Sequence, residues 1–128
     1  MPIRYEILPD LVRLEISGVM DAAEILAFYE AIAKDPAHRP GTPMLVDARN
    51  VTDAAPFQAL EGTAREATRT PIFSAPTKSA ALVSSSWMFG IVRQWAAISS
   101  DSPLVTRPFY DEAEARAWLA EPIGNRNS

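Results

Sequence analysis

Two short apolar runs in this sequence, residues 44–46 and 80–83, are each followed by side chains that could do chemistry. The first cluster offers a carboxylate, a guanidinium and an amide. The second offers hydroxyls, aromatic rings and a thioether. Such a mixture suits a pocket with flexible apolar walls and a polar anchor. The candidate ligand-binding residues are Asp47, Arg49, Asn50, Ser85, Ser86, Trp87, Met88 and Phe89.

The residue types that most reaction chemistries need are missing. The chain has no cysteine and a single histidine, His38, which we expect to lie in solvent. It has no histidine pair, calcium-type loop or glycine-rich phosphate loop, so we expect no metal and no cofactor. An enzyme would have to use Asp47 and Arg49 with Ser85 as an acid–base set. The spacing merely permits that set, and we expect a protein that is not an enzyme.

Each candidate residue also has a purely structural interpretation. Asp47 and Asn50 are residue types that commonly satisfy loop backbone groups. Ser86 is explained by helix capping alone. The helical stripe of Trp87, Ile91 and Trp95 is typical of a core. Both interpretations stay open from the sequence.

The elements that must position these residues begin with a hairpin. Alternating runs at 3–7 and 12–16, on either side of Pro9 and Asp10, predict two antiparallel strands with one buried face. Gly18 is expected to end the second strand. Asp21 then forms a capping pattern with Glu24, and the helix it starts should stop before Pro36.

The remaining elements alternate between strand and helix. The two apolar runs predict strands buried on both faces, the first ending at residue 47. Pro103 and Pro108 favour an edge position for a last strand at 104–109. Helices are predicted at about 87–99, after Asp111, and on a face formed by Phe57, Leu60, Ala64 and Ala67. The order ββαβαβαβα predicts an α/β fold with a mixed, mostly parallel sheet.

Size and charge limit the function classes. A chain of 128 residues fits one domain, which we place at residues 1–121, followed by a flexible tail at 122–128. The net charge of −4 argues against nucleic-acid partners and anionic membranes. No apolar run approaches the roughly 20 residues of a membrane span, and no signal peptide is visible. We therefore expect a cytoplasmic protein.

Three segments, residues 44–51, 80–90 and 107–119, together resemble the SpoIIAA-like family, small proteins with a STAS or CRAL-TRIO-like lipid-carrier fold. The resemblance implies that fold for the chain, and the family is largely without an assigned activity. Anti-sigma-factor antagonists of the wider STAS class carry a phosphorylatable serine in an Asp-Ser-Ser/Thr-Gly-like turn. The matching stretch here contains Thr52 and Asp53 but no Asp-Ser pair and no glycine. The resemblance therefore does not carry a phosphorylation site over.

These observations predict a non-catalytic binding or regulatory module. The expected ligand is a small apolar or amphipathic molecule, bound in a cleft at the carboxyl ends of the strands, where parallel sheets hold their ligands. The alternative is a protein-interaction module that acts as a homodimer through an apolar helix face and the edge strand near Leu104. An enzyme using Asp, Ser and Arg residues is the less favoured third hypothesis.

Overall fold

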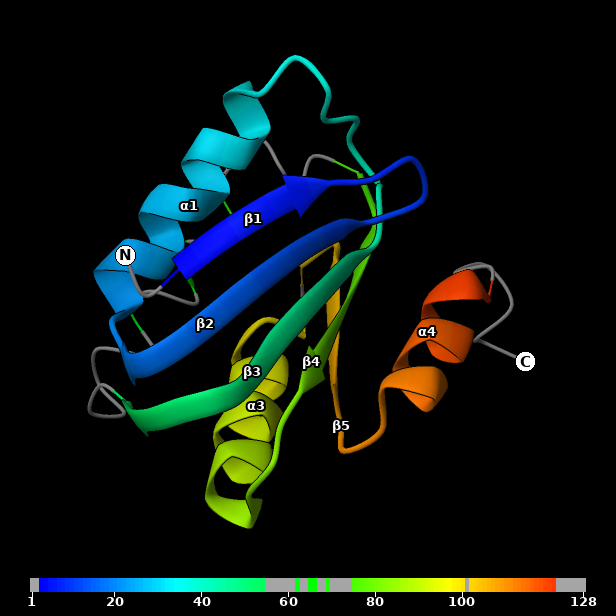
Figure 1. The fold of residues 1–128 in the computed structure, drawn as a ribbon. Helices are drawn as coiled ribbons and strands as arrows, with labels where there is room; N and C mark the ends of the chain where they lie inside the picture. Colours follow the sequence, from blue (N-terminus) through cyan, green and yellow to red (C-terminus); the bar gives the residue numbers. More distant parts are fainter. Residues whose placement is uncertain are drawn as a thin grey trace.

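The computed structural model describes residues 3–54, 62, 65–66, 69, 75–100 and 102–121. These residues form one five-stranded sheet in the order β1-β2-β3-β4-β5 (Figure 1). β1 is antiparallel to β2, and all the other neighbours are parallel. The predicted α/β fold, with a hairpin opening a mostly parallel sheet, is confirmed. The strands are β1 (Ile3–Ile7), β2 (Val12–Met20), β3 (Met44–Ala54), β4 (Thr77–Leu82) and β5 (Leu104–Phe109).

Three helices are described in full: α1 (Ala22–Lys34), α3 (Ser86–Ile98) and α4 (Glu112–Ala120). The Asp21 carboxylate accepts a hydrogen bond from the Ala23 N–H, and Asp111 accepts one from Glu114, so both predicted caps are confirmed. The cap of α3 is Ser85, whose hydroxyl accepts from the Met88 N–H, and not Ser86 as predicted. Adjacent serines look alike in the sequence, and the backbone decides between them because a cap residue must stay extended.

The helices are divided between the two faces of the sheet. α1 and α3 lie behind the sheet in Figure 1, and α4 lies on the other side. β2 to β5 follow one another in order, so right-handed crossovers place the connecting helices α1 and α3 on a common face. The core on that face includes Leu14, Ile32 and Val46. The core under α4 is smaller and includes Leu82 and Leu119.

A buried lysine fastens α4 to the sheet. Lys78 on β4 is almost fully buried, and its Nζ donates hydrogen bonds to the carbonyl oxygens of Trp118 at 2.7 Å and Glu121 at 2.8 Å. The ammonium also lies 4.8 Å from the centre of the Trp118 ring. A positive charge at the C-terminal end of a helix is favourable, because the unpaired carbonyls there are partly negative. This contact holds α4 over β4.

β2 and β3 are longer than the sequence predicts. β2 passes through Gly18, whose φ of 71° lies in the left-handed region, and continues to Met20. Glu15 pairs with Asp47 and Ser17 with Asn50, so β3 holds one extra residue in that interval. A second irregularity lies between Gly18 and Val19. β3 therefore continues well past residue 47, where the sequence predicted its end, because bulges break the alternation by which a strand is recognised.

β5 occupies one edge of the sheet, as its two prolines predict. The helix face predicted from Phe57, Leu60, Ala64 and Ala67 lies outside the described residues, as does the tail at 122–128. Arg65 and Glu66 are helical, and both are exposed, as is Arg69. Within the described ranges, no helix has the length and apolar character needed to cross a membrane.

Candidate functional site

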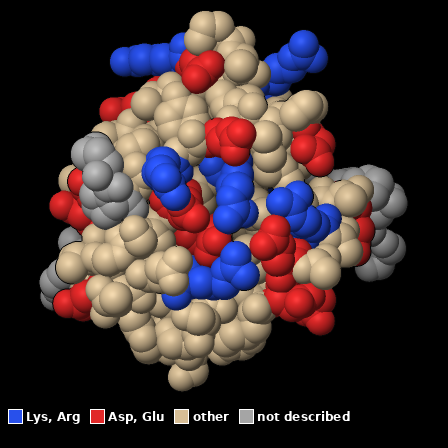
Figure 2. All heavy atoms as spheres, viewed as in Figure 1, with Lys and Arg blue, Asp and Glu red and all other residues tan. Residues whose placement is uncertain are grey.

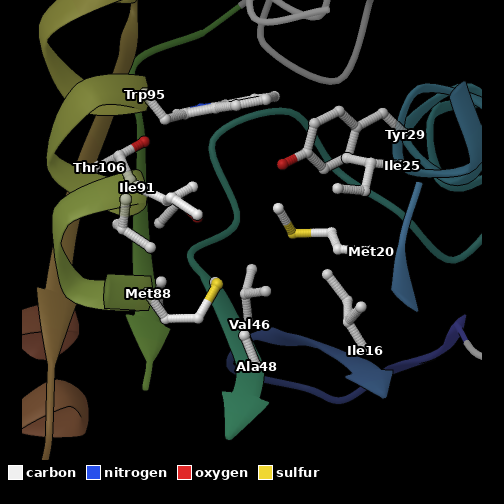
Figure 3. A pocket seen from close by; sticks show the side chains of 13 residues that line it. Ile16, Met20, Ile25, Tyr29, Val46, Ala48, Met88, Ile91, Trp95 and Thr106 are labelled. Atoms are coloured by element: carbon white, nitrogen blue, oxygen red, sulfur yellow. The ribbon is translucent and has the colours of Figure 1, made fainter. Parts of the chain in front are cut away.

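An apolar pocket lies on the sheet face that carries α1 and α3 (Figure 3). Its cavity volume is about 60 Å³, and it is open on one side. Met20 and Met88 reach toward each other across it, and the Trp95 ring lies along one side. The described residues that line it are Ile16, Met20, Ile25, Tyr29, Val46, Ala48, Ser79, Ala81, Met88, Ile91, Val92, Trp95 and Thr106.

The regular periods of strand and helix bring these residues together. Side chains two positions apart in a strand share a face, which places Val46 with Ala48 and likewise two residues of β4 on the pocket side. The four residues from α3 follow the helical spacing i, i+3, i+4 and i+7, beginning at Met88. This buried stripe is centred on Met88, Val92 and Trp95, whereas Trp87 is 43% exposed.

Three hydroxyl groups interrupt the apolar lining. They belong to Tyr29 on α1, Ser79 on β4 and Thr106 on β5. Burial raises the pKa of Tyr29, so its phenol is neutral at physiological pH. Ser79 and Thr106 are directly opposite each other in the β4–β5 register. A lining of this kind can hold an apolar molecule and offer it hydrogen bonds. Among the described lining residues, no side chain would exchange a proton near neutral pH.

Two of the predicted polar residues, Asp47 and Arg49, lie on the opposite face of the sheet, where Arg49 reaches Glu112 at the start of α4. Asp47 is 4% exposed and accepts hydrogen bonds from Arg13 at 2.9 Å and from the Arg49 guanidinium at 2.8 and 3.0 Å. The hydrogen bonds from Arg49 hold the pKa of Asp47 below its usual value, against the effect of burial. A carboxylate held ionised by two arginines is a weak proton acceptor. Its arrangement is that of a structural ion pair.

The ends of β3, β4 and β5 do converge, as the parallel topology predicts. The Ser84 hydroxyl donates to the carbonyl oxygen of Arg49 at 2.7 Å. The Arg49 guanidinium also reaches Glu112, at the start of α4, at 3.5 Å. Asp47 and Arg49, both predicted site residues, lie two positions apart on β3 and are hydrogen-bonded to each other. The cavity, however, lies deeper and on the other face.

Of the eight predicted ligand-binding residues, Met88 alone lines the pocket as described. Ser85 is occupied by its cap, while Asn50, Ser86 and Trp87 are exposed. Phe89 stacks on Tyr110 with the ring centres 5.0 Å apart. The sequence prediction missed the contributions of α1, β2, β4 and β5 to the lining. The alternation of side chains along a strand was the available signal, because residues an even number of positions apart, such as Ile16 and Met20, lie on one face.

Two further expectations concern titratable groups. His38 was expected in solvent but is half-buried, and burial lowers its pKa. Across the described ranges, no group of three or more histidine, aspartate or glutamate side chains is arranged to hold a metal ion.

No protein-family model matches the chain, and no curated protein sequence matches it. Several solved structures are similar to it, among them the following two. The first is an uncharacterized protein of the DUF3478 family with a SpoIIAA-like fold from Shewanella loihica PV-4, with a TM-score of 0.58, 15% identity and 92% of each chain covered. The second is an anti-sigma factor antagonist from Mycobacterium paratuberculosis, with a TM-score of 0.50, 14% identity and 93% of each chain covered. The chain therefore has a SpoIIAA-like fold, and the resemblance drawn from its sequence is confirmed at the level of the fold.

Proposed function

We propose that this protein is a non-catalytic binding module that takes a small apolar molecule into the pocket between α1 and α3. The observation that carries the proposal is the pocket itself, an open cavity in which apolar side chains dominate. Met20 and Met88 form two of its walls, and unbranched thioether side chains adapt to ligands of different shape. The pocket replaces the strand-end cleft as the place of binding.

The size of the cavity sets the scale of the first ligand to test. A cavity of about 60 Å³ is smaller than the roughly 150 Å³ of an engineered cavity that binds benzene. Cyclopentane is about as large as benzene, so it would enter only as Met20 and Met88 change rotamer and enlarge the cavity. Cyclopentane also carries no polar atom, so its binding reports on the apolar lining alone.

Methionine methyl NMR tests the proposal at the pocket itself. With ¹³C-methyl methionine, cyclopentane should shift the Met20 and Met88 signals. Met44 should stay unchanged, because it is buried outside the pocket lining. A titration in which neither pocket methionine responds to cyclopentane would contradict the proposal.

A matched pair of variants on α3 separates filling the pocket from disturbing the helix. Ile91 and Ile98 are both partly buried against the same core, and of the two only Ile91 lines the pocket as described. Ile91→Trp should fill the cavity and abolish the cyclopentane shifts. Ile98→Trp should leave them in place. Equal cyclopentane-induced shifts in the two variants would mean that cyclopentane binds outside this pocket.

A second candidate function is a protein-interaction module, which one surface feature favours. Tyr110 is 56% exposed and stacks on Phe89, and Trp87 is exposed on the same helix as Phe89. The similarity in fold to an anti-sigma factor antagonist supports a regulatory role through a protein partner. Light scattering at high micromolar concentration tests the homodimer form of this idea. A monomer would rule that form out, whereas a dimer lost in Tyr110→Ala would support it.

A further inference from the structure

One hydroxyl group in the pocket has no hydrogen-bond partner in the part of the chain that the structure describes. The Thr106 Oγ1 atom is buried and has no partner among the described residues. In Figure 3 this oxygen points toward the side of the pocket where Trp95 lies. A buried hydroxyl left unpaired is unfavourable for folding, and nearly all buried polar groups in proteins are paired. A ligand oxygen or N–H in the pocket would give Thr106 its missing partner.

Charged side chains are absent from the described lining. Along β4 and β5, the charged residues nearest to the pocket project to the other face. Lys78 binds the end of α4, and Arg107 lies over the Phe109 ring at 5.0 Å. An ionised group that entered the pocket would lose its water and find no counter-ion, which is strongly unfavourable. An uncharged group faces a much smaller penalty and can be compensated by one hydrogen bond.

We propose that the pocket selects uncharged ligands that carry a single hydrogen-bonding oxygen, and that Thr106 is the residue that recognises this oxygen. This inference rests on the proposed function, since it names the ligand class of the same pocket. A threonine hydroxyl both donates and accepts, so small alcohols and small ketones both fit. Carboxylates of the same size are excluded.

Three compounds built on the same ring separate the contributions of the apolar ring, a hydroxyl group and a negative charge to binding. They are cyclopentane, cyclopentanol and cyclopentanecarboxylate at pH 7.5. Each is titrated into the wild-type protein and Thr106→Val, with the Met20 and Met88 methyl signals as the readout. The ratio of wild-type to variant affinity is taken for each ligand, because this ratio cancels the different hydrophobicity of the ligands. Thr106→Val should weaken cyclopentanol binding about five-fold, the effect of one hydrogen bond, and leave cyclopentane unchanged. The carboxylate should shift neither methyl.

A second threonine provides a matched control. The Thr77 hydroxyl is buried and donates to the Ala75 carbonyl oxygen at 2.8 Å, away from the described pocket lining. Thr77→Val should lower the melting temperature and leave cyclopentanol affinity unchanged. Thr106→Val should instead raise the melting temperature by a few degrees, because it removes an unpaired buried hydroxyl. Opposite changes in stability and affinity distinguish a ligand-recognising hydroxyl from a structural one.

The outcomes distinguish this inference from the proposed function. One outcome is that cyclopentane shifts both methionine methyl signals while cyclopentanol binds Thr106→Val as tightly as wild type. That result would support the proposed binding pocket and contradict the role of Thr106. Equal shifts from the carboxylate and the alcohol would overturn the selection against charge. If none of the three compounds shifts either methionine, the proposed function fails and the inference fails with it.

Discussion

The two faces of the sheet are covered in different ways. On one face, α1 and α3 leave a cavity lined mainly by apolar side chains. On the other face, α4 packs onto β4 and β5, and charged side chains occupy the surface beside it (Figure 2). The apolar face therefore retains a cavity, whereas many charged side chains of the other face are paired with one another. A ligand site is better sought where buried hydrogen-bonding groups lack partners than where polar residues are most numerous.

The charged side chains beside α4 form ion pairs with one another. Arg4 lies opposite Glu15 across the hairpin, and the two side chains form an ion pair. Asp47 lies between Arg13 and Arg49, and Glu112 continues the chain of alternating charges. Alternation of sign leaves no large field of one sign to attract a charged partner. Asp47 and Arg49, two of the polar residues singled out from the sequence, belong to this network of ion pairs.

The sharpest contrast between the faces should appear in truncations of apolar side chains. Leu82 is fully buried under α4, so Leu82→Ala should lower the free energy of unfolding by about 3 kcal/mol. Ile91→Ala at the open pocket should cost about 1 kcal/mol, because this side chain is only partly buried. Urea denaturation measures both. Equal costs would mean that the two faces are packed alike.

Asp47→Asn tests the charged face and should lower the free energy of unfolding by about 2 kcal/mol, because it weakens charge-assisted hydrogen bonds to two arginines. The pKa of Asp47 is lower in the folded protein than its ordinary value of 3.8. Its contribution is therefore complete above that pH and is lost as the pH falls through the lower folded value. The stability difference between wild type and variant should shrink only in acid. A difference that grows in acid would contradict this interpretation.

Lys78→Met keeps the apolar stem of the side chain and removes the two hydrogen bonds to the end of α4. We expect a loss of about 1 kcal/mol, concentrated at the C-terminal turn of that helix. Hydrogen exchange should show faster opening of the last turn of α4 and unchanged protection in α1. Uniform loss of protection would mean that Lys78 supports the whole domain.

The smallest effect should come from Arg4→Ala. Arg4 pairs with Glu15 on the surface of the hairpin, and exposed ion pairs contribute little because water and salt screen them. The melting temperature should stay within the error of the wild-type value at 150 mM salt. A clear loss would show that the charged face acts as one cooperative network.

The sequence predicted the elements better than it predicted the site. Alternation in β1 and β2 and the caps at Asp21 and Asp111 are local signals, and each proved correct. β3 was cut short because its bulges depend on pairing with β2, which the strand's own sequence does not encode. The apolar pocket was not predicted for a similar reason. Its volume depends on how far α1 lies from α3, and Thr106 becomes distinctive only because its hydroxyl has no hydrogen-bond partner among the described residues.

The two edges of the sheet determine how the protein should behave when concentrated. β5 carries Pro108, which has no N–H to offer to an added strand. β1 is five residues long and places the charged residues Arg4 and Glu6 at the opposite edge. Short, charged or proline-containing edges resist the addition of a strand from another molecule. Growth of the sheet into fibrils or strand-swapped oligomers is thus disfavoured at both ends, and self-association would have to use side-chain surfaces instead.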